Sequence, residues 1–583
     1  MTHNSSQLTT QRRRTDIDRQ WWKEAVVYQI YPRSFNDSNG DGIGDIPGIT
    51  GKVDYLDALG VDVVWLCPVY DSPNHDNGYD IRDYRAILPE AGTMADWEEL
   101  LAELHDRDIR LIMDLVVNHT SSEHEWFQKS RRAEDGYEDY YYWRDGDVDD
   151  EGAPIPPNNW QSIFGGSAWT YDEAREQWYL HLFDENQPDL NWRNPDVRAD
   201  IKEMMNWWLE KGIDGFRMDA INYLSKAEGL PDGDPNEPII GVEHFSHGPR
   251  IHEYLQDLYD DTLAEYDTMT VGEMGATTIE QATDYLEEGG SGLDMIFQFN
   301  HLTVDHDTES RWGTGEWGEW YLSEFKTVVS EAQDKLADEF WDALFLGNHD
   351  LPRIVSRFGN DGVYREASAK LIATFLLTMR GTPYVYQGEE LGMTNTEFDS
   401  LEQVDDVQTV GNVKTLIEDG LIDSFEDIQG FVNYMNRDNA RTPMQWSGEQ
   451  HAGFTGGEPW LALNANYSEI NAERAMADED SVWNYYRRVI DLRHDVDTLV
   501  YGDYDLLLPD DEQVYAYTRT LDEEVVLVVL NWSNRSTRFA CSSVETSDAE
   551  LLVSNYAHTP IDPDEQEFRP YEAAVYRLDS DAS

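Results

Sequence analysis

The chain has 583 residues, of which 116 are acidic and 43 are basic, so its formal net charge is −73. Hydrophobic residues make up 40% and aromatic residues 12% of the chain, which is typical of a globular protein and excludes disorder of the whole chain. Such an acidic surface repels nucleic acid and anionic membranes, which we therefore exclude as partners. A chain of this length is expected to form about two to four structural units.

The N-terminal region shows no targeting segment. Its first twenty residues include basic side chains, but they are not followed by the apolar stretch that a secretion signal contains. No run of about 18 apolar residues, the length that crosses a membrane, occurs in the sequence. We expect a cytoplasmic protein in which residues 1–20 form a flexible tail.

Eight short apolar runs alternate with segments of helical periodicity. The runs cover residues 25–31, 61–69, 109–117, 215–221, 268–274, 293–299, 341–347 and 382–388. Between the second and third runs, residues 93–107 are predicted to form a helix with Thr93 as its N-cap and Trp97 and Leu104 on its apolar face. The alternation predicts parallel strands joined by helices, closed into a (β/α)8 TIM barrel over residues 1–119 and 190–499.

Two connections in this pattern are too long for simple turns. Residues 120–189, after the third strand, are rich in Trp, Tyr, Gly, Pro and Asp and are predicted to form an inserted subdomain over the barrel mouth. Residues 391–480 form a second insertion, after the eighth strand. From residue 500 the pattern changes to short alternating runs, which predict a C-terminal antiparallel β-sandwich domain over residues 500–583.

Polar residues lie at or near the carboxyl ends of several predicted strands, where the active site of a barrel is found. They are His119, Arg217, Asp219, Glu273, His349 and Asp350. A single Asp at a strand end is more often a helix cap or an ion-pair partner. When four strands each present such side chains at one rim, the like charges repel one another and lower the stability of the fold. Such a costly cluster indicates a functional site.

These segments resemble the four signature regions of the α-amylase family, and flanking motifs narrow the resemblance to its oligo-1,6-glucosidase and α-glucosidase branch. The motifs span nearly the whole chain and include YQIYPRSF from Tyr28, NGYDIRDY from Asn77, FGGSAW from Phe164, QPDLNW from Gln187 and ARTPMQW from Ala440. The acidic, lysine-poor composition also resembles that of proteins from salt-accumulating halophiles. The resemblance implies an α-glucosidase on a (β/α)8 barrel that acts on short oligosaccharides or disaccharides.

The resemblance implies a role for each of the strand-end acids. Asp219 is expected to be the nucleophile, Glu273 the general acid and then base, and Asp350 the carboxylate that grips the 2- and 3-hydroxyls of the distorted sugar. Arg217 shares a strand face with Asp219 and is expected to keep it ionised. A retaining mechanism predicts that the carboxyl groups of Asp219 and Glu273 lie about 5 to 5.5 Å apart and needs no cofactor for catalysis.

Further residues are implied to bind the sugar. His119 and His349 resemble the imidazoles that bind sugar hydroxyls in the family. Asp80 and Arg441 are implied to close the far wall of the pocket around the non-reducing glucose, which predicts action at the chain end. The aromatic walls of the sugar site are implied to be Phe164 and Phe183, although either ring could instead belong to the core of the inserted subdomain.

The loop DSNGDGIGD places oxygen donors at alternating positions, which suits a hard cation. The donors are the side chains of Asp37, Asn39, Asp41 and Asp45 and the carbonyl group of Ile43. The loop resembles half of an EF-hand, with Gly48 where the final Glu would stand, and the family branch binds Ca²⁺ or Mg²⁺ structurally here. We expect such an ion, remote from Asp219; a solvated acidic turn is the alternative.

The substrate preference rests on Ala220, which directly follows the implied nucleophile. In this branch a small residue there accompanies α-1,4 preference and Val accompanies α-1,6, so maltose is the expected substrate and transglucosylation a side reaction. An oligo-1,6-glucosidase, or a mutase of the trehalose or sucrose type, is the alternative. A non-catalytic transporter subunit is disfavoured because no membrane helix is present and all three acids are. The sequence leaves the oligomeric state open.

Overall fold

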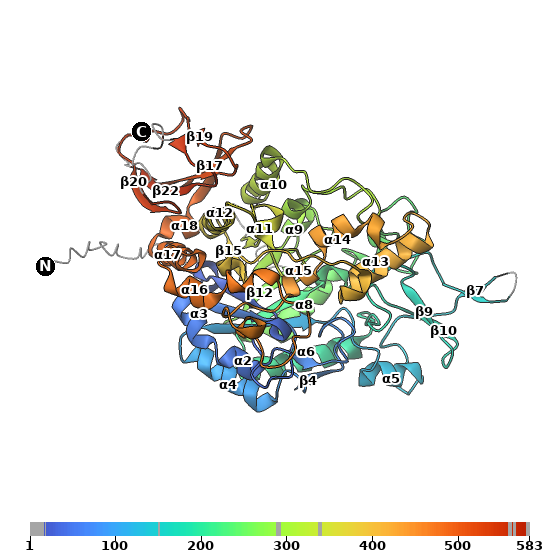
Figure 1. Ribbon diagram of the computed structural model, residues 1–583. Coiled ribbons are helices and arrows are strands. Elements are labelled where there is room, and N and C mark those ends of the chain that lie inside the picture. Colours follow the sequence, from blue (N-terminus) through green and yellow to red (C-terminus); the bar gives the residue numbers. More distant parts are fainter. Residues whose placement is uncertain are drawn as a thin grey trace.

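The computed structural model describes residues 17, 19–149, 152–286, 293–335, 341–557, 563 and 567–578. Of the expected N-terminal tail, residues 1–16 and 18 lie outside the described residues. Figure 1 shows a central barrel, a C-terminal β-domain against one side of it, and the strands β7, β9 and β10 projecting on the opposite side. Among the described residues, no helix is both long and apolar enough to cross a membrane.

Eight parallel strands form the barrel sheet, in the order β13-β12-β11-β5-β2-β1-β15-β14. A parallel bridge between Ile296 and Asp342 joins the two ends of this sheet and closes the barrel. The predicted fold class is confirmed, because every strand lies within one of the eight predicted apolar runs. The strands are β1 (Val27–Ile30), β2 (Val63–Leu66), β5 (Arg110–Val116), β11 (Gly215–Asp219), β12 (Met269–Glu273), β13 (Met295–Phe297), β14 (Ala343–Leu344) and β15 (Thr382–Tyr386).

Helices connect these strands and cover the outside of the barrel (Figure 1). The predicted helix at residues 93–107 is confirmed as α4 (Met94–His105), where Thr93 and Asp96 form a reciprocal capping box. Its Trp97 and Leu104 are fully buried against the barrel. The other main helices are α3 (Val53–Leu59), α6 (Pro195–Lys211), α8 (Ile251–Asp261), α9 (Ile279–Thr283), α10 (Leu322–Lys335), α12 (Arg365–Thr378) and α17 (Val482–Asp495).

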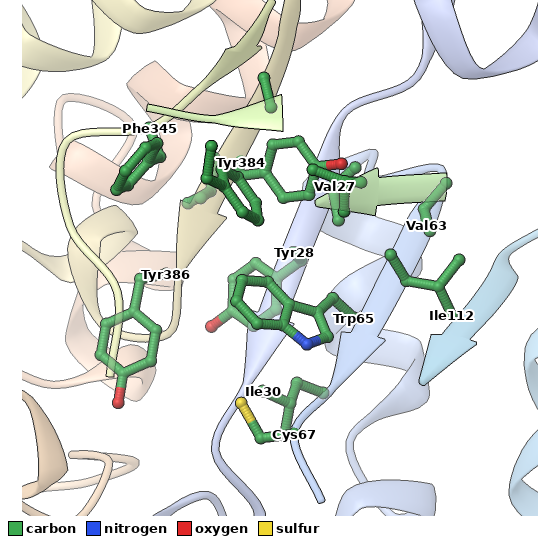
Figure 2. Close-up of a cluster of buried hydrophobic side chains, with 14 of the residues drawn as sticks. Val27, Tyr28, Ile30, Val63, Trp65, Cys67, Ile112, Phe345, Tyr384 and Tyr386 are labelled. Atoms are coloured by element: carbon green, nitrogen blue, oxygen red, sulfur yellow. The ribbon is translucent and has the colours of Figure 1, made fainter. Parts of the chain in front are cut away.

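Aromatic rings fill the barrel interior below the rim. Trp65 stacks on Phe297 with ring centroids 5.6 Å apart, and Tyr384 packs edge-on against Phe297 at 4.6 Å. Figure 2 shows Trp65 and Tyr384 among the buried side chains of the inner strands. These packed rings form the floor of the barrel mouth. Polar side chains nearer the carboxyl ends of the strands therefore lie next to an apolar surface, where the local dielectric constant is low.

The segment after β5 forms a small antiparallel sheet with the order β6-β10-β9. Its strands are β6 (Trp143–Arg144), β9 (Trp169–Asp172) and β10 (Gln177–Leu180), accompanied by α5 (Glu125–Arg131) and the hairpin β7 (Asp147–Val148) and β8 (Pro154–Ile155). A bridge between His119 and Asp189 ties the start and end of this insertion together at the barrel rim. The insertion after strand three is thus present; its boundaries, 120 and 189, stay a prediction.

The segment after β15 carries short helices with a core of their own. They include α13 (Val407–Glu418), α14 (Gln429–Met435), α15 (Asp438–Arg441) and α16 (Ala472–Ala477). Phe398, Val413 and Phe431 belong to a buried cluster in this segment that is distinct from the main barrel core. The segment therefore forms a compact second wall beside the barrel mouth.

The C-terminal domain contains a five-stranded antiparallel sheet, β16-β17-β18-β22-β20, and a two-stranded sheet, β19-β21. Side chains alternate along β17 between two cores, because Tyr515 and Tyr517 join the barrel core whereas Val514 and Ala516 face Phe568 in the domain's own core. The predicted antiparallel β-sandwich is confirmed. The strands are β16 (Asp503–Leu507), β17 (Val514–Leu521), β18 (Glu524–Asn531), β19 (Thr537–Arg538), β20 (Glu550–Ser554), β21 (Glu567–Phe568) and β22 (Ala573–Leu578).

Candidate active site

The centre of the candidate site is the guanidinium group of Arg217. On β11, Arg217 and Asp219 point to the same inner face of the barrel, and Arg217 pairs in register with Asp114 on β5. Its Nη1 donates to Oδ1 of Asp114 and to Oδ1 of Asp219, each at 2.6 Å, and its Nη2 lies 2.8 Å from Oε2 of Glu273. One buried cation therefore holds three carboxylates together at the end of the strands.

Burial and neighbouring charge set the pKa values of two of these acids apart. Burial raises the pKa of Asp219 to about 6, although the charge of Arg217 opposes the shift. Burial raises the pKa of Glu273 further, to about 7, because the charges of Asp219 and Asp350 add to the shift that Arg217 opposes. Near neutral pH Asp219 is thus the more ionised acid and Glu273 the more protonated one.

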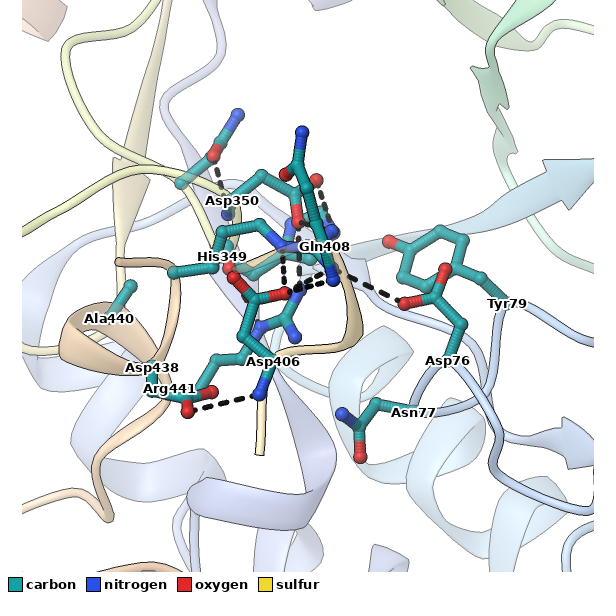
Figure 3. A network of polar contacts seen from close by, with 12 residues as sticks. Asp76, Asn77, Tyr79, His349, Asp350, Asp406, Gln408, Asp438, Ala440 and Arg441 are labelled. Carbon is teal, nitrogen blue, oxygen red and sulfur yellow. Dashed lines mark hydrogen bonds and ion pairs between the residues drawn. The ribbon is translucent and has the colours of Figure 1, made fainter. Parts of the chain in front are cut away.

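Asp350 sits in the strongest positive surroundings of the site. Its Oδ1 accepts hydrogen bonds from Arg437 at 3.0 Å and Arg441 at 2.8 Å, and its Oδ2 lies 3.0 Å from Nε2 of His349. Burial alone would raise its pKa, but His349 and the two arginines outweigh burial and hold the pKa of Asp350 well below its usual value. Figure 3 shows this network at the meeting point of the segments after β14 and β15.

The structure corrects the expectation for Asp80. Its side chain is fully buried and accepts hydrogen bonds from Ser72 Oγ and from the backbone amides of His75 and Asp76. Asp80 therefore braces the loop beneath the pocket and does not face Arg441. The acid that faces the pocket arginines is Asp76.

Asp76 and Arg437 form the far wall that was predicted for Asp80 and Arg441. Oδ1 of Asp76 lies 3.5 Å from Nη2 of Arg437, which also contacts Asp406 at 2.5 Å and Asp350 at 3.0 Å. Burial raises the pKa of Asp76 to about 7 even though Arg437 and Arg441 oppose the shift. Arg441 contacts Asp350, and its Nε donates to the carbonyl of His349.

The two predicted histidines line the pocket as neutral imidazoles. Burial lowers the pKa of His119 to about 4, and its Nε2 lies 3.1 Å from the carbonyl oxygen of Tyr79 and 3.2 Å from Nε2 of Gln187. Burial also lowers the pKa of His349, whose ring stacks on Tyr79 with centroids 5.2 Å apart. Tyr79 thus spaces the two imidazoles across the pocket.

Phe164 and Phe183 meet at the mouth, with ring centroids 5.4 Å apart. Phe183 packs on His119 at 5.0 Å, and the guanidinium of Arg437 lies 5.1 Å from the ring of Phe164. Both rings therefore belong to the pocket wall as well as to the inserted subdomain. Their sugar-facing role stays a prediction.

Ala220 adopts the left-handed conformation, with φ 43° and ψ 38°, which is uncommon for a residue with a side chain. Its backbone N–H donates to Oε2 of Glu273 at 3.1 Å. The turn therefore links Ala220, the residue after Asp219, to Glu273. The short side chain of Ala220 packs in the cluster that contains Tyr223 and Phe245.

The predicted cation loop has the expected oxygen donors, and their side chains also accept hydrogen bonds from backbone amides of the loop. Asp37, Asn39 and Asp41 each accept a backbone N–H from the residue two positions ahead, at 2.9, 2.9 and 3.0 Å. Asp45 instead caps α2 (Ile46–Thr50), accepting from Gly48 N at 2.6 Å. Within the described residues, no group of three or more His, Cys, Asp or Glu side chains is placed to hold a metal ion.

The sequence analysis did not select several pocket residues. They are Asp76, Asp114, Gln187, Asp406 and Arg437. Asp76 directly precedes the motif that starts at Asn77, and Arg437 lies three residues before the motif that starts at Ala440, so both lie just outside the motifs that were singled out. Only the fold shows which acid and which arginine of each segment turn into the pocket.

A (β/α)8 barrel that presents two carboxylates on one arginine at the carboxyl ends of its strands has the architecture of a glycoside hydrolase. Residues 29–502 match the family model described as alpha amylase, catalytic domain, and residues 504–575 match maltogenic amylase, C-terminal domain. The chain belongs to the alpha-amylase family and is a glycoside hydrolase of its glucosidase type.

Three relatives illustrate this membership. The chain is 52% identical to an oligo-1,6-glucosidase of Halalkalibacterium halodurans, over 96% of this chain and 99% of that protein. It is 46% identical to the trehalose-6-phosphate hydrolase of Bacillus licheniformis, whose structure superposes with a TM-score of 0.89 over 96% of this chain and 100% of that one. For the isomaltulose synthase of Klebsiella sp. LX3, the identity is 44%, the TM-score 0.91 and the coverage 96% and 100%.

Proposed function

We propose that this protein is a retaining α-glucosidase that releases glucose from the non-reducing end of short α-glucosides. The observation that carries the proposal is the single guanidinium of Arg217, which holds both Asp219 and Glu273. A retaining mechanism needs two carboxyl groups at a short separation, one ionised and one protonated. The pKa values of about 6 for Asp219 and about 7 for Glu273 support that division.

In the first step, Glu273 donates its proton to the glycosidic oxygen while Asp219 bonds to the anomeric carbon. The leaving sugar departs, and a covalent glucosyl-Asp219 ester remains. Glu273, now ionised, then takes a proton from water, whose oxygen attacks the anomeric carbon and frees Asp219. A sugar hydroxyl in place of water gives transglucosylation.

The far wall supports action at the chain end. Asp76 and Phe164 both contact Arg437, and Asp350 is held between Arg437 and Arg441. These groups offer donors and acceptors to the hydroxyls of a terminal glucose.

The assignment is tested by replacing each acid. We expect Asp219→Ala to abolish glucose release from maltose and from 4-nitrophenyl α-glucoside, with an unchanged far-ultraviolet circular dichroism spectrum, because the substitution removes the carboxylate that bonds to the anomeric carbon. The control is Asp503→Ala, an exposed acid on β16. Retained turnover in Asp219→Ala would refute the assignment.

Linkage preference is proposed from Ala220. Its short side chain, next to Asp219, leaves space for an α-1,4-linked leaving sugar of the maltose type. A side-chain difference of this size changes the discrimination between two substrates by about 1–3 kcal/mol. The second candidate is an α-1,6 preference, which the name of the Halalkalibacterium halodurans relative favours. We expect kcat/KM to be higher for maltose than for isomaltose; the reverse ratio would establish the second candidate.

Two rivals follow from the other relatives. A phosphorylated substrate needs an unpaired cation, but Arg217, Arg437 and Arg441 each already contact a carboxylate, which favours neutral sugars. A sucrose isomerase would return an isomer instead of free sugars. We expect free glucose and fructose from sucrose, and isomaltulose or trehalulose as the main product would show isomerisation.

We also propose that the loop from Asp37 to Asp45 binds Ca²⁺ or Mg²⁺ in a structural role. Side-chain oxygens of Asp37, Asn39 and Asp41 and the carbonyl of Ile43 supply the hard donors that these ions prefer. We expect a chelator to lower the melting temperature of the wild type and to have no such effect on Asp41→Ala. An equal melting temperature of the wild type with and without chelator would contradict the proposal.

A further inference from the structure

The side chain of Gln29 is buried inside the barrel, next to the candidate site. Gln29 lies on β1, is 1% exposed, and pairs in register with Trp65 on β2 and Tyr386 on β15. Its Nε2 lies 2.8 Å from Nδ1 of the His349 imidazole. A residue with no part in the proposed proton transfers therefore contacts a residue that lines the glucose pocket.

Aromatic rings restrain the plane of the His349 imidazole. The ring of Tyr79 lies 5.2 Å away at an interplanar angle of 6°, and the ring of Tyr31 lies 5.9 Å away at 18°. Figure 3 shows His349 and Tyr79 in this part of the site. Parallel stacking restrains the tilt of a ring but not its rotation within its own plane. The in-plane orientation therefore depends on the hydrogen bonds of the two ring nitrogens.

Asp350 determines which nitrogen of His349 carries the proton. Burial lowers the pKa of His349, although Asp350 opposes the shift. The charges of Arg217 and Arg441 lower this pKa further. The imidazole is therefore neutral near neutral pH and has one N–H group. Its Nε2 lies 3.0 Å from Oδ2 of Asp350, an ionised carboxylate that can only accept a hydrogen bond. The proton is therefore on Nε2, and Nδ1 has to accept.

Gln29 is placed to donate to that nitrogen. The NH2 group of its amide has two hydrogens, one for Nδ1 of His349 and the other for Sγ of Cys67, at 3.2 Å. The opposite orientation of the amide would set its carbonyl oxygen against the unprotonated Nδ1, and two acceptors repel each other. The stacked rings, Asp350 and Gln29 together leave the imidazole one tautomer and one orientation.

We propose that Gln29 is a positioning residue, which holds His349 with its Nε2–H group directed at Asp350 in the glucose pocket. The proposal rests on the proposed α-glucosidase function, in which Asp350 grips the hydroxyls of the distorted sugar. Without the hydrogen bond from Gln29, the imidazole is free to turn within its plane, and Asp350 loses a donor that fixes it. Because the sugar is distorted most in the transition state, the loss is expected mainly in kcat.

The first test removes the donor and keeps the size of the side chain. For Gln29→Met we expect kcat for 4-nitrophenyl α-glucoside to fall about 10- to 100-fold, with a smaller change in KM, because a misdirected group stabilises the transition state less. Gln333→Met is the matched control, since Gln333 is also buried but lies on α10, where it donates to the carbonyl of Arg380. An unchanged kcat in Gln29→Met would overturn the proposal.

Gln29→Glu separates positioning from packing, because the two side chains have the same size. The introduced carboxyl group satisfies Nδ1 of His349 only with an added proton that the two groups share. This proton is lost as pH rises, so we expect kcat/KM of the variant to fall in a titration that the wild type and Gln333→Glu lack. A pH profile that is lowered by the same factor at every pH would show a purely structural role and contradict the proposal.

The tautomer can be measured without substrate. In nitrogen NMR spectra of protein with labelled histidine, the His349 signals are identified by their loss in His349→Gln. We expect a protonated Nε2 in the wild type and a mixture of tautomers in Gln29→Met. A wild type with its proton on Nδ1 would refute the role of Gln29, whatever the reaction. If the tautomers are as expected but the wild type releases no glucose, the α-glucosidase proposal alone fails.

Discussion

Arg217 is buried and contacts Asp114, Asp219 and Glu273, three acids that would otherwise repel one another. It also lies 5.1 Å from the ring of Trp65, part of the aromatic floor of the barrel. The residue therefore combines two effects, since it permits the acids to approach and it fixes their positions. A lysine could not make these contacts simultaneously, because it lacks the forked guanidinium.

The pH dependence of catalysis follows from the same contacts. Catalysis needs Asp219 ionised, which is favoured above its pKa of about 6, and Glu273 protonated, which is favoured below its pKa of about 7. We expect kcat/KM for maltose to rise and then fall with pH, with its maximum between these two values. Measurement of initial rates from pH 4 to 9 at constant salt checks the profile.

Glu273→Gln isolates the alkaline limb of that profile. With 4-nitrophenyl α-glucoside, whose leaving group needs little protonation, we expect residual activity that no longer falls on the alkaline side. An alkaline limb that persists in this variant would mean that another group titrates there.

Among the structural elements, the inserted subdomain is locked to the barrel by a buried ion pair. Lys226, which follows β11, lies 2.6 Å from Asp189 at the end of the insertion and donates to Asn118 at 2.8 Å. Asp189 in turn accepts from the backbone amide of Leu182, the residue before Phe183. One cation therefore positions both His119, next to Asn118, and the aromatic wall.

Loss of this cation is expected to be costly. Lys226→Met leaves Asp189 buried without its partner, so we expect a loss of about 3–5 kcal/mol in the free energy of unfolding. Lys202→Met is the control, because Lys202 pairs with Asp257 and Asp261 near the surface, where an ion pair contributes only about 0–1 kcal/mol. Equal unfolding midpoints for the two variants in urea would contradict the expectation.

The barrel strands were predictable from the sequence because each is an apolar run with polar residues after it. Arg217 and Asp219 were predictable as neighbours because alternate residues of a strand share a face. The helix α4 was predictable because its cap and its apolar face are local in sequence.

The far wall was not predictable to the residue. Asp76 and Asp80 lie in one irregular loop. The loop has no strand or helix periodicity from which to predict which of the two side chains faces the pocket. The choice is made by tertiary contacts, because Ser72 and two backbone amides satisfy Asp80 and leave Asp76 to Arg437.

At the scale of the whole molecule, the 43 basic residues are too few to balance 116 acids. Several of the arginines are also buried and so do not contribute to the surface. Buried arginines include Arg217, Arg353, Arg357, Arg437, Arg441, Arg493 and Arg519. Acids such as Asp114 and Glu390 are buried as well, so the surface keeps a large excess of negative charge, and its self-repulsion opposes the compact state.

Salt is expected to relieve that repulsion. As KCl rises from 0.1 to 1 M, the Debye length falls from about 10 to about 3 Å, so the acids on the surface repel one another less. We expect the thermal unfolding midpoint and the activity to rise over this range. A midpoint that stays constant or falls with KCl would argue against a halophilic protein.

The tyrosine-bearing face of the C-terminal sheet makes that domain inseparable from the barrel. Tyr515 packs on Phe375 of α12 at 5.4 Å, and Lys326 of α10 donates to the carbonyl of Leu508 at 2.8 Å. A fragment truncated at the family boundary near residue 502 would uncover a strip of aromatic rings on two helices. Because exposed aromatic surface promotes aggregation, we expect such a fragment to form inclusion bodies on expression. A redesigned C-terminal domain should keep a strand that covers those rings.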